Sequence, residues 1–354
     1  MKSLKRLISI CLSAVCSVSI AASMFPLCGS AQENYGNLTY KIRDNGTIAI
    51  TGCADDAKSV VIPESIGGKA VTKIFAYAFS NKTKLKDITI PKSITEIGTR
   101  AFFNTPWLDL MAKNDPLVTV NSILIDAAKC KGDIVIPSDV TSISQYAFYH
   151  NSQITSIVIP NAVTKIESGT FTGCSALKSV KLPSSIQSIG STAFYKCKGL
   201  TEITIPKSVS AIENNAFFGC SGLKRVTIEN PNCSLDGDNV FTTIGLDEGK
   251  PEPFIGTIYG NDNSTAHEYA DKNNCKFLAV NEYGVIGDAN GDGNISPIDV
   301  SIIFTEYKKL YRNEKGSFTD NQIKLCDLNG NEKINASDAS AVFSIYKENY
   351  RRAH

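Results

Sequence analysis

"LTEITIPKSVSAIENNAFFGCSG", residues 200–222, is one copy of a pattern that is 23 residues long. Leu200, Ile203 and Ile205 alternate with polar residues, which is the period of a half-buried strand. A second short strand is expected in "SVSAI", and "NAF" then returns the chain to the interior. One such unit cannot bury its own apolar face, whereas stacked units share a continuous core. The pattern therefore predicts a solenoid of parallel strands.

The same residue types recur along the chain at this spacing or at twice it. A proline follows Ile or Leu at the end of each predicted first strand, and a phenylalanine follows each second strand. The doubled gap of 46 residues contains a degraded unit, at residues 105–126. The recurring positions are Pro91, Pro137, Pro160, Pro183 and Pro206, and Phe79, Phe102, Phe148, Phe171, Phe194 and Phe217.

Asn and Cys side chains are expected to form a ladder at one turn of every coil, where leucine-rich repeats use them to satisfy backbone groups. The cysteines of this ladder are interpreted as structural, rather than as a disulfide set or a metal site. The predicted ladder is Asn81, Asn104, Asn151, Cys174, Cys197 and Cys220. Five further cysteines give no readable pairing: Cys53, Cys130, Cys233, Cys275 and Cys326.

The consensus "IPxSVxxIxxxAFxxCxxL" resembles the BspA-like leucine-rich repeats of bacterial surface and secreted proteins. The resemblance covers about residues 38–280, from a first segment with an Asn45-Gly46 hairpin turn to a closing segment at residues 256–280. It implies adhesion and protein binding, and no shared catalytic activity.

The repeats contain no recognisable catalytic motif, because the three histidines lack Ser, Cys or carboxylate partners at a meaningful spacing. We therefore expect no enzyme activity. One aromatic column follows the buried phenylalanines and has two interpretations. Its side chains stack sugar rings or anchor a partner, or they pack on each other along the solenoid, which is favoured. The column is Phe103, Tyr149, Tyr195 and Phe218.

A second duplication lies near the C-terminus, where "GDANGDGNISPIDV" at residues 287–300 recurs 39 residues later as "CDLNGNEKINASDA". Calcium prefers six to eight oxygen ligands, and a loop of twelve residues supplies them from alternating positions. Gly293 fits the sharp turn at position 6, where the second loop has Glu332. The predicted ligands are Asp288, Asn290, Asp292, Asn294, Ser296 and Asp299, and then Asp327, Asn329, Asn331, Lys333, Asn335 and Asp338.

These loops predict two Ca2+ sites, and the second is expected to bind more weakly because it has two ligand carboxylates where the first has three. A helix is expected after each loop. None is expected before the first, because "FLAVNEYGVIG" does not read as one. The apolar positions of the two helices are Val300, Ile303, Phe304 and Tyr307, and Ala339, Val342, Phe343 and Tyr346.

Duplicated calcium loops, each with only the trailing helix, resemble dockerin domains, over about residues 284–354. The resemblance implies calcium-dependent docking to a cohesin module of a scaffold protein, in cellulosomes and related bacterial assemblies. It places partner-binding residues at loop positions 10 and 11. These are Pro297 and Ile298, and then Ala336 and Ser337.

The N-terminus has the three-part layout of a secretory signal peptide, with Lys2, Lys5 and Arg6 before an apolar run and small residues ending at Ala31. A retained membrane anchor is the rival interpretation. The formal net charge of +1 argues against nucleic-acid binding.

The expected organisation is a signal peptide at 1–31, a β-rich leucine-rich-repeat solenoid at 32–283 and a small all-α dockerin at 284–354. We expect an extracellular, non-catalytic binding protein, associated with the cell surface or a cellulosome. The ligand of its solenoid is plant cell-wall polysaccharide or a protein. The alternative is a cellulosomal enzyme of the glycoside hydrolase type.

Overall fold

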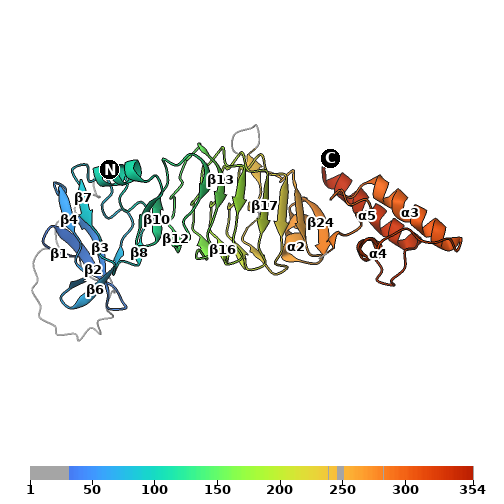
Figure 1. The fold of residues 1–354 in the computed structure, drawn as a ribbon, viewed down its shortest axis with the longest axis horizontal. Helices are drawn as coiled ribbons and strands as arrows, with labels where there is room; N and C mark the ends of the chain where they lie inside the picture. The colour runs from blue at the N-terminus through green and yellow to red at the C-terminus, as the bar shows by residue number, and fades with distance from the viewer. Residues whose placement is uncertain (1–31, 238, 245–250, 282, 354) are drawn as a thin grey trace, which may run out of the picture. The chain divides into compact units, whose positions relative to one another are not determined.

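Two strands per coil build two parallel ladders along the repeats (Figure 1). In the computed structural model, which describes residues 32–237, 239–244, 251–281 and 283–353, paired residues of neighbouring coils are 23 apart, as in Ile203 and Val226. The predicted parallel solenoid is confirmed. One ladder is divided into two sheets. The first contains β11 (Gly132–Val135), β13 (Ile154–Val158) and β15 (Ser179–Lys181), and the second contains β17 (Glu202–Ile205), β19 (Arg225–Ile228), β23 (Thr257–Gly260) and β24 (Lys276–Asn281). The other contains β14 (Lys165–Ile166), β16 (Ser188–Ile189), β18 (Ala211–Ile212) and β20 (Ser234–Leu235).

In the N-terminal part, β2 (Leu38–Ile42) and β3 (Ile48–Cys53) form a hairpin. Its turn is the predicted one: the Gly46 amide donates to the Arg43 carbonyl, and Gly46 has the left-handed φ of 79° that its lack of a side chain permits. The neighbouring strands are β1 (Glu33–Tyr35), β4 (Ser59–Val61), β5 (Ser65–Ile66), β6 (Lys69–Ile74), β7 (Asp87–Thr89) and β8 (Glu96–Ile97).

The recurring phenylalanines form the predicted buried column. Each is at most 2% exposed, and successive rings lie 5.0–5.5 Å apart between centroids. The column is interrupted between Phe102 and Phe148, and the apolar core divides there into two clusters. On the N-terminal side of this break Trp107 packs against Phe102, with ring centroids 4.7 Å apart.

The break is the degraded unit, in which a helix replaces a regular coil. α1 (Pro106–Asn114) begins where Thr105 caps the Leu108 amide, with Pro106 at the first position, which suits proline because no amide is needed there. The chain then forms the strands β9 (Val118–Val120), β10 (Ile123–Asp126) and β12 (Ser142–Ile143).

The Cys ladder is confirmed for the regular coils. The thiols of Cys174, Cys197 and Cys220 donate to the carbonyls of phenylalanines one coil back, at 3.0–3.1 Å. Asn151 shares the position and donates to the Ala127 and Cys130 carbonyls. All eight cysteines of the described residues are buried free thiols, and burial strongly raises the pKa of Cys197.

The prediction was wrong for Asn81 and Asn104, which lie one position earlier in the coil. Both are exposed, have left-handed backbones (φ 62° and 56°), and the Asn104 amide donates to the Asn81 side chain. Their counterpart in a regular coil is Gly173. The mistake has a physical reason: asparagine suits both a left-handed turn position and a buried amide that satisfies carbonyls.

The repeats end in a cap that continues directly into the C-terminal helices. The cap contains α2 (Thr265–Lys272), and β24 pairs antiparallel with β25 (Gly284–Val285), so that the proposed boundary at residue 283 falls in the turn between these strands. Then come α3 (Pro297–Tyr311), α4 (Asp320–Cys326) and α5 (Ala336–Ala353). A short pair, β21 (Thr243–Ile244) and β22 (Pro251–Glu252), precedes the cap.

The helices after the two loops are confirmed, with two corrections. Ile303 and Val342 are fully buried, whereas Phe304 and Phe343 are 41% and 40% exposed and lie outside the core. The second loop also has a helix before it, since α4 ends at Cys326, directly before the loop. The strand β25 precedes the first loop.

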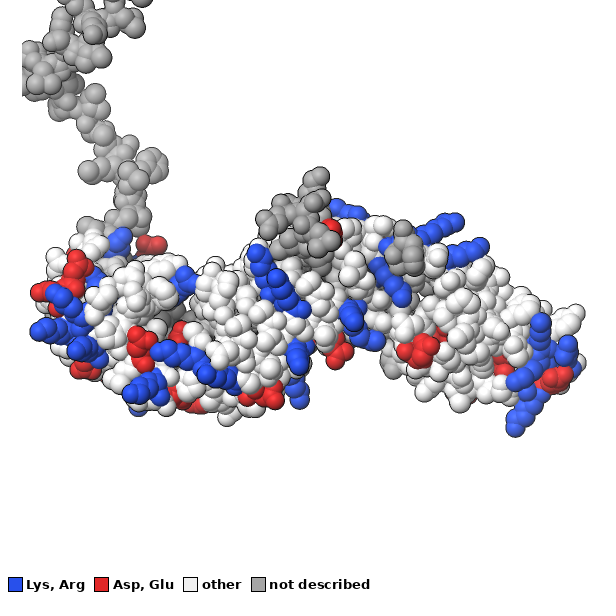
Figure 2. All heavy atoms as spheres, turned by 90° about the horizontal axis from the view of Figure 1, so that it is seen from above, with Lys and Arg blue, Asp and Glu red and all other residues white. Residues whose placement is uncertain are grey.

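The proposed signal peptide lies outside the described residues. Within residues 32–353, apart from the short gaps, no helix has both the length and the apolar character needed to span a bilayer. On the face shown in Figure 2, cationic and anionic side chains are interspersed and do not form one large patch of either sign.

Candidate functional site

The first acidic loop is folded around the carboxylate of Asp288. This carboxylate is almost fully buried and accepts the backbone amides of Gly291 at 2.8 Å, Asp292 at 3.2 Å and Gly293 at 2.7 Å. Gly293 has φ 79°, the left-handed turn expected at position 6. Burial and the nearby Asp299 and Asp292 carboxylates raise the pKa of Asp288, because each disfavours its charged form.

The loop closes where α3 begins. The fully buried Asp299 accepts the Ser296 amide at 2.8 Å and hydroxyl at 2.9 Å, and Ser296 in turn caps the helix. Asp299 also accepts the Ala289 and Asn290 amides, which join the two ends of the loop. The same residues therefore start the helix and place the predicted ligands of positions 1 and 12 together.

The second loop repeats this arrangement. Asp327 accepts the Asn331 and Glu332 amides, and the fully buried Asp338 accepts the amides of Leu328 and Asn335. Glu332 occupies the left-handed turn, with φ 60°, in place of glycine. Ile334, like Ile295 in the first loop, points into the shared core.

The donor chemistry of both loops fits a hard cation. Among the described residues, none of the five loop aspartates has a Lys, Arg or His partner within ion-pair distance. In the described part of the chain, no three His, Cys, Asp or Glu side chains form a group that could hold a metal ion. The predicted donors of both loops are carboxylate, amide, hydroxyl and backbone oxygens. Such an oxygen set suits calcium better than the softer metals that prefer Cys and His.

The predicted partner-binding positions are all on the surface. Ile298 is 59% exposed beside Pro297 at the start of α3, and Ala336 and Ser337 are exposed at the start of α5. The first pair is apolar, whereas Ser337 hydrogen-bonds with Asn335 and Asn329. The two loops thus present chemically different surfaces.

Residues 18–123, 52–151 and 141–252 match the BspA type leucine rich repeat region, in six copies, and together span about two thirds of the chain. The chain belongs to the BspA-type leucine-rich repeat family. Residues 286–344 match the dockerin type I domain. Domains of this type bind calcium, and a dockerin implies docking to a cohesin.

Solved structures of bacterial leucine-rich repeat proteins are similar to this BspA-type chain in fold. A leucine rich cell surface protein from Faecalibacterium prausnitzii is 19% identical, with 71% of this chain and 73% of that chain covered and a TM-score of 0.36. A leucine-rich repeat protein from Bacteroides ovatus is 18% identical, covering 70% and 100%, with a TM-score of 0.34. The pneumococcal vaccine antigen PcpA is 15% identical, covering 71% and 99%, with a TM-score of 0.35. No curated protein matches the chain.

The aromatic column of the BspA-type repeats behaves differently at its two ends. Tyr195 and Phe218 stack with centroids 5.6 Å apart and planes within 7°, as the packing interpretation predicts. Phe103 and Tyr149, on opposite sides of the degraded unit, are 48% and 38% exposed. The guanidinium of Arg100 lies over both rings, a contact that the repeat pattern does not predict.

Proposed function

We propose that the protein is a secreted, non-catalytic subunit that docks through its dockerin onto a cohesin-bearing scaffold and presents the solenoid as a recognition surface. The observation that carries this proposal is the duplication of one arrangement: a buried loop carboxylate at the start of a helix, beside an exposed pair of residues. The setting would be adhesion or the degradation of plant polysaccharide outside the cell, where dockerin and BspA-type proteins are typically found.

In this proposal the two loops hold two calcium ions. The ligands are the twelve residues of the sequence prediction, with the Asn294 and Lys333 carbonyls at position 7. What supports the assignment is the set of amide hydrogen bonds that wraps each loop around Asp288 or Asp327. Bound calcium would neutralise the loop carboxylates and order the exposed residues that follow them.

Docking would use Pro297 and Ile298 in one orientation, or Ala336 and Ser337 in the other. The exposed Ile298 gives the first pair an apolar anchor that the second lacks. We therefore expect a cohesin to bind one of the two surfaces more tightly.

The test is calorimetric binding of a panel of type I cohesin modules to residues 32–354, in calcium and after chelation. Binding should require calcium, should weaken more in Asp299→Ala than in Asp338→Ala for a cohesin that uses the first surface, and should persist in Lys196→Gln. Calcium-independent binding, or none to any cohesin, would overturn the docking proposal. Sugar release from plant polysaccharides by the pure protein would favour the glycoside hydrolase alternative.

A further inference from the structure

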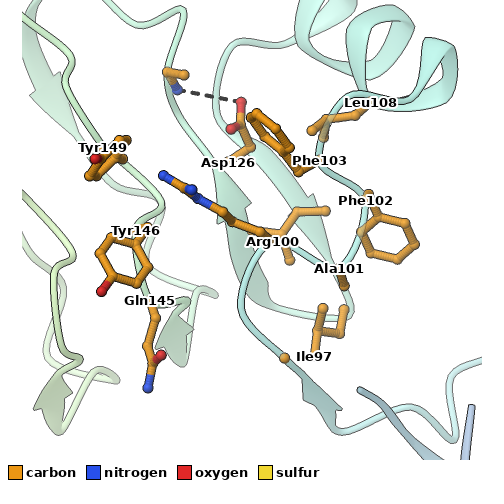
Figure 3. A pocket seen from close by; sticks show the side chains of 13 residues that line it. Ile97, Arg100, Ala101, Phe102, Phe103, Leu108, Asp126, Gln145, Tyr146 and Tyr149 are labelled. Carbon is orange, nitrogen blue, oxygen red and sulfur yellow. Dashed lines mark hydrogen bonds between the residues drawn. The ribbon is translucent and has the colours of Figure 1, made fainter. Parts of the chain in front are cut away.

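A pocket opens in the solenoid at the degraded unit. Because α1 replaces a regular coil there, the aromatic side chains of the flanking coils do not stack as Tyr195 and Phe218 do. They border a cavity of about 80 Å³, whose walls include Phe102, Leu108 and Gln145 (Figure 3). A water needs about 15 Å³, so the cavity has room for roughly five waters or for one substituent of a larger ligand.

Arg100 extends into this pocket with its guanidinium among three aromatic rings (Figure 3). The guanidinium carbon lies 4.3 Å from the ring centroid of Tyr149, 5.2 Å from that of Tyr146 and 5.3 Å from that of Phe103. These rings favour the cation electrostatically and restrict its orientation. The Arg100 side chain is thus held in place by its neighbours.

The guanidinium has no anionic partner in the part of the chain that the structure describes. No carboxylate lies within ion-pair distance of it, and its N–H groups have no hydrogen-bond acceptor there. The Asp126 carboxylate, in the same pocket wall, accepts the Ala128 amide, and burial raises its pKa to about 6. An oriented arginine whose N–H groups lack protein acceptors is suited to a planar anion from outside the protein.

The backbone at the pocket is strained where this side chain originates. Arg100 and Tyr146 are equivalent positions of their coils and have φ values of 50° and 61°. The equivalent positions of the other coils are also left-handed, at Tyr77, Gly169, Thr192 and Asn215, so this backbone conformation belongs to the repeat as a whole. A left-handed backbone costs a residue with a side chain of order 1 kcal/mol, and the coil imposes it on Arg100 and Tyr146 as it does on Tyr77 and Thr192.

We propose that this pocket binds a uronic acid residue of an acidic polysaccharide, with the sugar carboxylate on the Arg100 guanidinium and the sugar ring against the exposed side chains of Tyr149 and Phe103. The guanidinium fork matches a carboxylate, and aromatic faces pack well on the C–H face of a sugar. The proposal names the ligand of the recognition surface and so rests on the function proposed above.

An acidic peptide is disfavoured by the backbone around the pocket. Coil-to-coil hydrogen bonds already use the amides of Ala127, Phe148 and His150, which donate to the carbonyls of Ala147, Thr170 and Thr172. A peptide that added as a strand would need an unpaired sheet edge. A sugar needs only the side chains.

The test is calorimetric titration of residues 32–354 with trigalacturonic acid, its methyl ester and hexaglutamate in one calcium buffer. Arg100→Gln should lower the affinity for trigalacturonic acid by about ten- to a hundredfold, the value of a hydrogen-bonded ion pair. Methyl esterification should have a similar effect. The matched control is Lys196→Gln, which removes a cation 5.1 Å from the Tyr195 ring in a later coil and should leave the affinity unchanged.

Arg100→Lys retains the charge but loses the fork, and it serves as the second variant if Arg100→Gln lowers the melting temperature. Equal affinity in the wild type and the Arg100 variants, equal binding of the methyl ester, or no binding of trigalacturonic acid would each overturn the proposal. Tighter binding of hexaglutamate would assign the pocket to an acidic peptide. Calcium-dependent cohesin binding, measured on the same samples, shows whether such a failure concerns the pocket alone.

Discussion

At the scale of single residues, the left-handed turn positions of the coils have a regular spacing but irregular residue types. Each coil has two such positions, occupied by residues as different as Tyr77, Asn81 and Lys196. A left-handed φ favours Gly and Asn but does not exclude other types when the surrounding coil fixes the backbone. The positions therefore follow the 23-residue period although their residue types do not.

The calcium loops offer a direct test of this cost. Replacing Glu332, which has φ 60°, by Gly should raise the free energy of unfolding by about 1 kcal/mol and tighten calcium binding at the second loop. Isothermal calcium titration and thermal melting measure both effects. The matched variant is Gly293→Ala in the first loop. An added Cβ there meets nothing closer than an arginine nitrogen at 3.7 Å, so the variant changes only the conformational cost of the left-handed backbone.

Gly293→Ala should weaken the first site and lower the stability. If neither variant alters binding, position 6 does not limit the affinity of either loop. A first loop that binds no tighter than the second in the wild type would contradict the expected order of the two sites.

Buried thiols predict a loss of stability in alkali. Burial raises the pKa of Cys130 and Cys275 to about 11 and of Cys233 to about 12, from an ordinary value near 9. The folded state therefore keeps protons that the unfolded chain releases above about pH 8.5. The contribution of these buried thiols to the stability is fully present below that pH, and it is lost as the pH rises toward 11.

Urea midpoints measured under reducing conditions between pH 7 and pH 9.8 test this, since the upper limit keeps most tyrosine and lysine ionisation out of the range. The midpoint should fall as the pH rises, and the fall should be smaller in Cys233→Ala than in the wild type. A flat profile in the wild type would contradict the prediction.

At the scale of elements, the buried phenylalanine column is the main contact between coils. Phe194 lies between Phe171 and Phe217, with centroids 5.1 Å and 5.0 Å away, so its removal opens a cavity that two coils share. Phe194→Ala should cost about 3–5 kcal/mol in denaturant unfolding. Val135→Ala on the exposed face of β11, where the side chain is mostly in solvent, should cost less than about 1 kcal/mol. Equal losses would mean that the column is not the main source of stability.

The elements that could be predicted are those whose pattern repeats. The strand pairs, the Phe column and the thiol donors of Cys174 and Cys197 follow from one period, because every coil meets the same neighbours. The helix α1 and the Arg100 pocket do not follow from it: the degraded unit has no period, and Arg100 meets Tyr146 across 46 residues. In the dockerin, loop spacing located the acidic residues and the trailing helices. The exposure of Phe304 and the short helix α4 depend on how the helices pack together.

At the scale of the whole molecule, the solenoid cap and the dockerin share one apolar core. Tyr259 and Leu278 of the cap belong to the same buried cluster as Ile303 and Val342 of the helices. The Tyr259 hydroxyl donates to the carbonyl of Gly293 in the first calcium loop, at 3.2 Å, and the Arg352 guanidinium of α5 donates to the Cys275 carbonyl. The dockerin is therefore coupled to the end of the solenoid by direct packing.

Calcium should consequently stabilise the end of the solenoid as well as the dockerin, because a ligand that binds only the folded state raises the free energy of every opening coupled to it. Hydrogen exchange with mass spectrometry should show slower exchange of β24 (Lys276–Asn281) in calcium than in chelator. β13 (Ile154–Val158), several coils away, is the internal control and should exchange at the same rate in both. Protection confined to the calcium loops would contradict the coupling.

The constant offset of 23 residues between paired strands means that every regular coil lengthens the solenoid by the same step. Each coil advances the ladder by about 4.8 Å, the spacing of neighbouring strands. Removing residues 184–206 would join Pro183 to Lys207 with every later residue still in register. The number of coils between the Arg100 pocket and the dockerin can therefore change in whole steps without any new fold, and the distance between these two parts of the surface would change by the same step for each coil.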